Sequence, residues 1–376
     1  MAEGFQTGID TLLADREDLL ARRRVGLLAH PASIDARGVH TSQRLHDEPG
    51  VQLTALFGPE HGFFGGGGAG DAIASARHPA WDIPVHSLYG DHRRPTPEML
   101  RDVDAIVFDL QDLAVRCYTF VTTLRYVLEA AARSGTRVIV CDRPVPFAEM
   151  LDGPMPSPAH ESFVAGVPAP LVYGMTPGET ARWLKHALNL DVDLHVAAMQ
   201  GWRRGPRRAE RTPWVSPSPG IRSWETAWCY PATVCFEALP AIDYGRGSLL
   251  PFQVVTAPFI DAENFSAALN RLRLKGVAFQ PHWQPAPGAR LVITNPRVFR
   301  PVATGIAILH TLQTLYGAEN IWSHPGTRED FFDKLMGTAS VREELKSGNN
   351  WKRIVKGWQP TLAEFDEIRQ SVLLYT

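Results

Sequence analysis

The sequence predicts a two-domain α/β protein, with a Rossmann-like, mostly parallel sheet in residues 1–200 and a smaller α+β domain in residues 201–376. A chain of 376 residues is too long for one typical hydrophobic core. In its first part, short apolar runs alternate with helical patterns, which is typical of parallel sheets covered by helices on both faces. Near Gln200 this alternation stops, and we place the domain boundary there.

The first domain is predicted to alternate between helix and strand. Thr96-Pro97 and Thr176-Pro177 are helix-start signals, and Gly135 is a helix stop. The short, almost wholly apolar runs between such signals are predicted strands. In chain order, helices are expected at residues 8–22, 41–47, from 96 onward, 118–135 and 176–188, and strands at 24–30, 51–57, 104–110, 136–142 and 193–199.

The second domain differs from the first in composition and in its pattern of predicted helices and strands. Residues 201–224 are rich in Arg, Trp and Pro without any period, which predicts a long loop or linker. Beyond them, strands are expected around residues 229–236, 251–258 and 290–294, with a helix near 262–274. From Pro301 to Tyr375 the apolar spacing is mostly helical.

Composition excludes several classes of protein. The chain is 44% hydrophobic with a net charge of -2, so charge gives no support to a nucleic-acid or acidic-membrane partner. Its four cysteines show no CxxC spacing and are expected to be buried thiols. No window has the apolar length of a membrane span. No signal peptide is visible, so the sequence as written predicts a cytoplasmic protein, or an exported one if a signal has been removed.

Polar residues follow four of the predicted strands where each strand ends. Ligands bind at the carboxyl ends of strands in open parallel sheets, so four polar ends at one edge predict a functional cleft. Asp109, Asp112 and Asp142 are equally compatible with turn-forming bonds or an internal ion pair. The residues at these ends are His30; Glu60 and His61; Asp109, Gln111 and Asp112, with Arg116 and Tyr118 after them; and Asp142 and Arg143.

The stretch FGPEHGFFGGGG at residues 57–68 follows the second of these strands. Such a flexible segment loses much conformational entropy on folding, which favours a loop whose backbone must approach a ligand closely. We therefore expect residues 65–70 to border the cleft, with at least one at positive φ. The formal G-x-G-x-x-G match of Gly65, Gly67 and Gly70 is weak evidence for a nucleotide, because any glycine run satisfies it.

The acids and histidines support two kinds of chemistry. A carboxyl or imidazole with a shifted pKa serves general acid–base catalysis. The same groups could hold a divalent metal, with Asp109, Asp112 and His61 as ligands.

The motifs GPEHGFFG, IPVHSLYGDHRRPTPEML, VFDLQDLAVRCYT, CDRPVP, YGMTPGETA, GRGS and the closing LLY together resemble the exo-β-N-acetylmuramidase (NamZ-type) family, formerly a domain of unknown function. The resemblance runs from about residue 7 to 375. It implies a Rossmann-like catalytic domain and a smaller C-terminal domain with the cleft between them. It also implies an exo-acting glycosidase of cell-wall recycling, which releases N-acetylmuramic acid from the non-reducing end of peptidoglycan fragments, and implies no cofactor.

The resemblance also implies roles for individual residues. Glu60 is the expected general acid, with His61 orienting it, and Asp112 and Glu237 are further catalytic candidates. The arginines are expected to hold the lactyl carboxylate of muramic acid, because a guanidinium fork matches a carboxylate; each could instead form a salt bridge. The expected substrate-binding residues are His30, Gln111, Arg116, Tyr118, Asp142, Arg143 and Arg246.

This chain departs from the family pattern at three places. Val145 replaces an Asn, His30 replaces an Asn before Pro31, and the segment before Gly245 around Tyr244 has shifted or lost an acidic residue. These departures leave sugar specificity open. They also keep a non-catalytic sugar-binding homologue, and the metal-dependent hydrolase above, as rival functions.

Overall fold

The computed structural model describes residues 4–15, 19–205 and 213–376. Its N-terminal part is built on a seven-stranded sheet with the order β3-β4-β2-β1-β5-β6-β7. All neighbouring strands are parallel except β3, which pairs antiparallel with β4. The predicted fold class is confirmed. The strands are β1 (Arg24–Ala29), β2 (Gln52–Gly58), β3 (Ala76–Arg77), β4 (Pro84–Ser87), β5 (Ala105–Asp109), β6 (Arg137–Cys141) and β7 (Leu194–Ala197).

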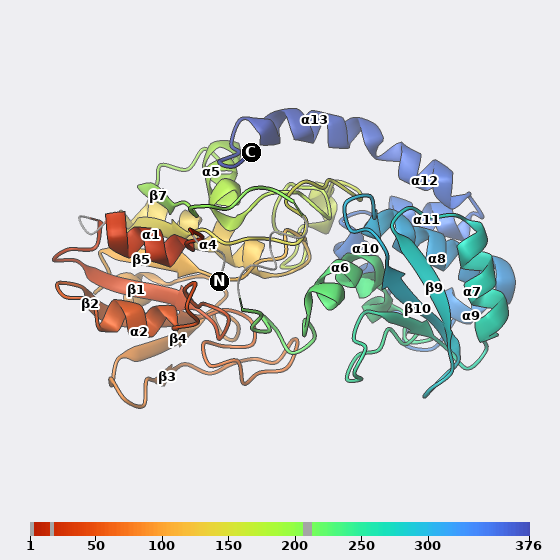
Figure 1. The fold of residues 1–376 in the computed structure, drawn as a ribbon, viewed down its shortest axis with the longest axis horizontal. Helices are drawn as coiled ribbons and strands as arrows, with labels where there is room; N and C mark the ends of the chain where they lie inside the picture. Colours follow the sequence, from red (N-terminus) through yellow and green to blue (C-terminus); the bar gives the residue numbers. More distant parts are fainter. Residues whose placement is uncertain (1–3, 16–18, 206–212) are drawn as a thin grey trace.

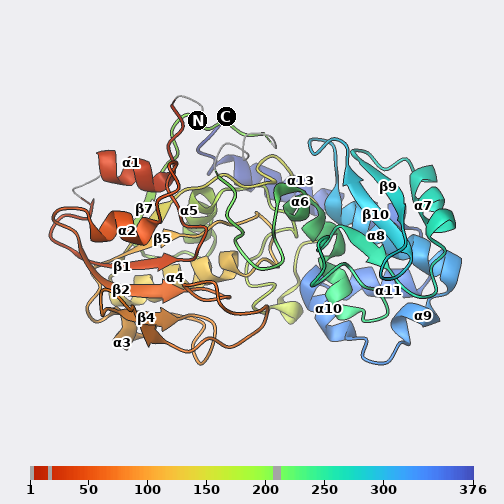
Figure 2. The ribbon, with the colours of Figure 1, turned by 60° about the horizontal axis from the view of Figure 1, so that its bottom comes forward.

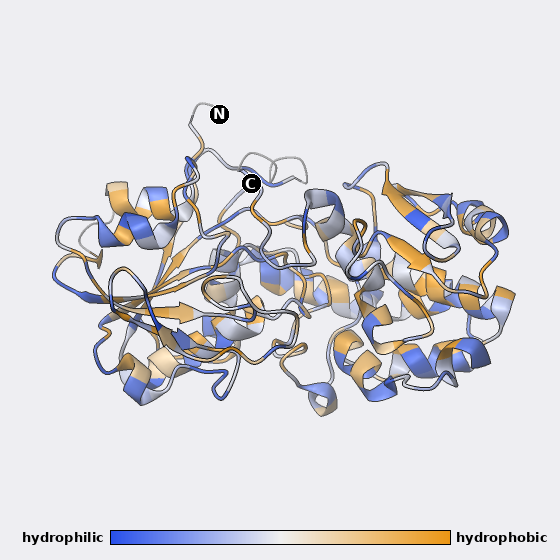
Figure 3. Cartoon of the chain, turned by 90° about the horizontal axis from the view of Figure 1, so that it is seen from below, coloured by the Kyte–Doolittle hydropathy of each residue, from blue (hydrophilic) through white to orange (hydrophobic). Residues whose placement is uncertain are grey.

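Helices cover both faces of this sheet (Figures 1 and 2). One face packs its apolar side chains against α1 and α2, and the other packs against α4 and α5. Because both faces are covered, the central strands are apolar except at their ends, and Figure 3 shows them largely in orange. The helices here are α1 (Gly8–Asp15), α2 (Thr41–His46), α3 (Pro97–Leu100), α4 (Phe120–Ser134), η2 (Pro158–His160) and α5 (Pro177–Ala187).

The C-terminal part contains a three-stranded antiparallel sheet, ordered β8-β10-β9, surrounded by helices (Figure 1). Helix α8 is buried along most of its length and packs against α6 and α7. The elements are α6 (Trp224–Thr233), η4 (Val234–Ala238), β8 (Val254–Thr256), α7 (Ala262–Arg271), β9 (Val277–His282), β10 (Gly288–Ile293), α8 (Pro301–Tyr316), α9 (Glu319–Trp322), α10 (Glu329–Met336), α11 (Ser340–Lys346), α12 (Trp351–Gly357) and α13 (Gln359–Gln370).

Several predicted boundaries were wrong. The strand expected at residues 229–236 is the end of α6 followed by η4. This segment is buried on every side, so it shows no helical period in its polarity. The short strands β3, β4 and β9 were not predicted. Helix α1 ends at Asp15 rather than at residue 22, and residues 16–18, like residues 206–212 of the expected linker, lie outside the described ranges.

The end of the chain returns to the N-terminal part. Helix α13 crosses from the second part towards α5 (Figure 1). There the backbone N–H of Leu374 donates to Glu179 over 2.8 Å, and the Tyr375 hydroxyl donates to Asp142 over 2.6 Å. The last residues are therefore anchored to the N-terminal part. Within the described residues, the helices include none with the length and apolarity that crossing a membrane would require.

Candidate active site

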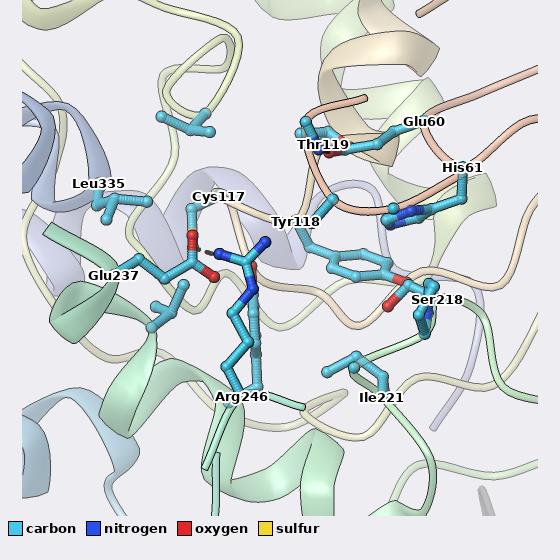
Figure 4. A pocket seen from close by; sticks show the side chains of 18 of the residues that line it. Glu60, His61, Cys117, Tyr118, Thr119, Ser218, Ile221, Glu237, Arg246 and Leu335 are labelled. Carbon is cyan, nitrogen blue, oxygen red and sulfur yellow. Dashed lines mark hydrogen bonds between the residues drawn. The ribbon is translucent and has the colours of Figure 1, made fainter. Parts of the chain in front are cut away.

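A cavity of about 680 Å³ lies between the two parts of the protein. The N-terminal part contributes the segment after β2, the loop before α3 and the start of α4. The C-terminal part contributes η4, the loop after it and α10, and the segment before α6 closes one side. Of the predicted site residues, Glu60, His61, Tyr118, Glu237 and Arg246 line this cavity (Figure 4).

Glu60 is held by two fixed donors. The Thr119 hydroxyl donates to its Oε2 over 2.7 Å, and the Gly70 N–H donates to its Oε1 over 2.9 Å. Thr119 is the N-cap residue of α4, and it makes no side-chain capping bond to that helix. Glu60 is buried at the edge of the cavity. Two donors aimed at the two oxygens form an arrangement that suits an ionised carboxylate beside a helix N-terminus.

His61 lies next to Glu60 in a left-handed backbone conformation, with a φ of 73°. Such a conformation is uncommon for a residue other than glycine and is often found at functional sites. Its Nδ1 is 3.0 Å from the Gly67 carbonyl oxygen. Because a carbonyl only accepts, Nδ1 carries the proton in this bond.

The glycine segment was predicted to border the cavity over residues 65–70, and its residues 68–70 do so. Gly68 and Gly70 are among the lining residues, and Gly65 and Gly70 have φ values of 74° and 83°. A Cβ on Gly67 would lie 2.3 Å from the Ile73 side chain, whereas one on Gly66 would meet nothing within 4 Å. The flexible stretch therefore folds back to place the Gly70 N–H on Glu60.

Gly70→Ala is expected to lower kcat on the order of tenfold with little change in Tm. The added Cβ disfavours the positive φ that aims this N–H at Glu60, at a cost of about 1 kcal/mol. Gly66→Ala is the matched control, because its φ is ordinary and its surroundings are open. Equal activity of the two variants would show that the Gly70 bond does not position Glu60.

Glu237 faces the cavity from η4 in the C-terminal part. It is half-buried, and burial is the largest cause that raises the pKa of its carboxyl, with the charge of Glu60 acting in the same direction. The guanidinium of Arg246 opposes this shift, and Figure 4 shows it directed towards Glu237. The Arg246 Nη1 is also 3.5 Å from the Tyr244 hydroxyl.

Tyr118 lines one side of the cavity, and His30 lies behind it. Tyr118 is buried edge-on against Phe120 and Tyr230. His30 lies outside the lining, with its Nδ1 3.2 Å from the Pro217 carbonyl oxygen, while its Nε2 accepts the N–H of Gln111 over 2.9 Å. Burial lowers the pKa of His30 to about 3. The neutral His30 imidazole therefore links Pro217, which precedes the lining residue Ser218, to Gln111 at the end of β5.

Gln111 and Asp112 also lie behind the cavity wall. The Gln111 side chain donates to the Pro144 carbonyl over 2.7 Å and to the Asp112 carbonyl over 3.0 Å. The Asp112 carboxylate accepts the Ala114 N–H over 2.8 Å and the Tyr173 hydroxyl over 3.1 Å. Burial raises the pKa of Asp112 to about 6.

Asp142 and Arg143 at the end of β6 are likewise engaged by protein groups. Asp142 accepts bonds from the Thr176 hydroxyl and the Tyr375 hydroxyl, and burial, with the charge of Glu179, raises its pKa to about 7. Arg143 makes a two-pronged ion pair with Asp109. The predicted strand-end residues thus share one edge of the sheet, but Glu60 and His61 turn into the cavity while these others turn into the protein.

Arg116 is wholly buried between the two parts of the protein. Its guanidinium donates to the carbonyls of Pro154 and Ala169, both over 2.9 Å, and of Leu335 in α10, over 3.1 Å. Among the described residues it has no carboxylate partner, and burial lowers its pKa to about 10. It joins the segment that carries Thr119 to the helix that forms the opposite wall.

Arg116→Met is expected to lower the free energy of unfolding by about 3 kcal/mol, because three buried carbonyls lose their donor. Urea unfolding measures this change. A variant with parental stability but weakened binding of N-acetylmuramic acid would instead place Arg116 on the substrate, the role that the sequence suggested.

The proposed metal ligands do not come together. Asp109 is paired with Arg143, Asp112 is held by backbone N–H groups and Tyr173, and His61 is bonded to Gly67. In the part of the chain that the structure describes, no group of three or more His, Cys, Asp or Glu side chains is placed to hold a metal ion.

Sequence reasoning missed several lining residues: Tyr89, Arg93, Thr119, Phe163 and Arg328. Two of these, Tyr89 and Arg93, lie within the motif IPVHSLYGDHRRPTPEML, so a signal existed. Thr119 is the last residue of the motif VFDLQDLAVRCYT, but at a helix start a threonine is ordinarily explained as a cap. The departure at Val145 is fully buried and lies outside the lining, so it does not alter the cavity wall directly.

Comparison with known proteins agrees with this architecture. The model of the N-terminal region of the exo-beta-N-acetylmuramidase NamZ matches residues 25–225, and that of its C-terminal region matches residues 228–375. The peptidoglycan beta-N-acetylmuramidase NamZ of Bacillus subtilis (strain 168) is 37% identical over 98% of this chain and 91% of its own length.

Two crystal structures of DUF1343 family proteins from Bacteroides fragilis NCTC 9343 resemble the whole chain. The first has a TM-score of 0.93 at 31% identity and the second has 0.75 at 23% identity, each covering 99% of both chains. The second supports the fold alone. Family models that match both halves, together with a curated relative along nearly the full length, show that the chain belongs to the NamZ exo-β-N-acetylmuramidase family.

Proposed function

We propose that this protein is an exo-acting β-N-acetylmuramidase, which removes N-acetylmuramic acid from the non-reducing end of peptidoglycan fragments. One observation carries the proposal beyond family membership. Glu60 and Glu237 line one cavity from different parts of the protein, and their surroundings differ. Glycoside hydrolysis uses two carboxyl groups in different protonation states, which environment can set.

We assign Glu237 as the proton donor and Glu60 as the ionised partner. The sequence favoured Glu60 as the acid, but its two donors suit a carboxylate, whereas burial raises the pKa of Glu237. In hydrolysis, the bond between the anomeric carbon and the bridging oxygen breaks, and that oxygen takes the proton of Glu237. Water supplies the new oxygen on the anomeric carbon, and its remaining proton restores the acid.

Glu60 then stabilises the positive charge that develops at the anomeric carbon. That contribution is common to direct attack by water, attack by the carboxylate and assistance by the acetamido group of the substrate. His61 and Thr119 hold the loop and the carboxylate in place. Asp112, Asp142, Arg143 and Gln111 support the wall from behind.

The test is release of N-acetylmuramic acid from the disaccharide in which it is linked to N-acetylglucosamine, followed by chromatography of the products. A second assay uses a glycan whose reducing end has been marked by reducing its N-acetylmuramic acid to the ring-opened form. Release of unreduced N-acetylmuramic acid shows exo-action at the non-reducing end, whereas release of longer fragments shows internal cleavage. Binding of N-acetylmuramic acid without any hydrolysis would favour the sugar-binding rival.

A further inference from the structure

Arg93 is the one cavity-lining cation, among the described residues, that makes no hydrogen bond or ion pair with the protein. The others have partners. Arg222 donates to the carbonyls of Pro219 and Ser248, and Arg246 donates to the Tyr244 hydroxyl. Arg328 donates to the Glu237 carbonyl, and Lys334 forms an ion pair with Asp330.

Two aromatic rings hold the Arg93 guanidinium in place. Its Cζ is 5.1 Å from the centre of the Tyr89 ring and 4.7 Å from that of Phe163. The two rings lie 5.5 Å apart. Cation–π attraction to the two rings restrains the guanidinium and leaves its N–H groups free to donate. Arg93 therefore offers the cavity a restrained guanidinium whose N–H groups suit a planar anion such as a carboxylate.

We propose that Arg93 binds the lactyl carboxylate of the muramic acid unit and thereby selects this sugar. The inference rests on the proposed function and names the residue that determines its specificity. The sequence had suggested Arg116, Arg143 and Arg246 for this task. Arg116 and Arg143 are buried outside the cavity, and Arg246 faces Glu237.

The position of Arg93 fits a group on the same sugar that is cleaved. The ring of Tyr89, which lies against Arg93, is also close to Glu60. Burial, together with the negative charge of Glu60, raises the pKa of Tyr89 to about 12. The subsite therefore adjoins the carboxylate assigned to the anomeric carbon. The lactyl ether carries the fixed negative charge of N-acetylmuramic acid, and N-acetylglucosamine lacks that ether.

The experiment compares two chromogenic substrates, para-nitrophenyl β-N-acetylmuraminide and its lactamide, in which a neutral amide replaces the carboxylate. Wild-type protein should prefer the acid by kcat/KM. Arg93→Met should lower kcat/KM for the acid on the order of a hundredfold and leave the lactamide within about threefold, because only the charge-assisted fork is lost. The kcat/KM of Arg93→Lys for the acid should lie between those of the wild type and of Arg93→Met.

Arg94→Met is the matched control. Arg94 is the neighbouring residue, stacks on Tyr126, pairs with Glu129 and does not line the cavity. It should keep the wild-type preference for the acid.

An unchanged preference in Arg93→Met, or equal losses on both substrates, would overturn the inference, as would a wild-type protein without any preference. If Arg93→Met does not fold, as judged by circular dichroism, the ratio in Arg93→Lys decides by the same criterion. A wild-type protein that hydrolyses neither these substrates nor the natural disaccharide would instead overturn the proposed function.

Discussion

Glu60→Gln is expected to lower kcat by on the order of a hundredfold or more on both the natural disaccharide and a para-nitrophenyl muraminide. Glutamine keeps the size of the side chain but cannot carry the negative charge that opposes the developing positive charge at the anomeric carbon. Because that charge develops whatever the leaving group, the loss should not depend on it.

The variant should fold normally. The glutamine oxygen can still accept the Gly70 N–H, and its amide can donate to the Thr119 hydroxyl, which both donates and accepts. Thermal unfolding and binding of N-acetylmuramic acid check this. Thr119→Val removes one donor but leaves the charge, so it should lose much less activity than Glu60→Gln. Near-parental rates for Glu60→Gln on both substrates would exclude a charged role for Glu60.

The fold could be predicted because its signals are local. Each central strand is a short, mostly apolar run, and α4 and α5 end or begin at recognisable caps, such as Gly135 after α4 and the capping box at Thr176. The elements that were missed lack these signals. The segment of α6 around Pro231 is apolar and buried on all sides, so neither its period nor its composition separates a helix from a strand.

The sequence could predict at which edge of the sheet the candidate site lies, but not which side chains point into it. Parallel strands bring their carboxyl ends together, which placed Glu60 and Asp142 at one side of the sheet. Whether each side chain turns into the cavity depends on residues far along the chain. The Arg116 guanidinium donates to the Leu335 carbonyl, 219 positions away, and Asp142 accepts a hydrogen bond from the Tyr375 hydroxyl, 233 positions away. No pattern near either residue encodes such a partner.

Arg93 shows the opposite case. Its sequence neighbourhood, with two arginines and a proline before a helix, is typical of an exposed loop. Only the folded chain brings Phe163, from the loop between η2 and α5, next to its guanidinium. Arg93 remains exposed, so it is distinguished from an ordinary surface charge by its place in the cavity wall and by the two aromatic rings against its guanidinium.

Glu237→Gln should give a result that depends on the leaving group. A sugar leaving group needs a proton as the bond breaks, so kcat on the natural disaccharide should fall on the order of a hundredfold. A para-nitrophenolate leaves without one, so the loss on that substrate should stay below about tenfold. Both rates are measured with one preparation, and Glu60→Gln is the control whose losses are alike.

The pH dependence supplies a second test of the same residue. A proton donor works only while protonated, so wild-type activity on the disaccharide should fall as the pH rises through the pKa of Glu237. Burial raises that pKa above the ordinary value for a glutamic acid, which moves the fall towards neutral pH. Glu237→Gln should retain its small residual activity across that range, because glutamine does not titrate. A parental alkaline limb in the variant, or equal losses on both leaving groups, would assign the proton to another acid.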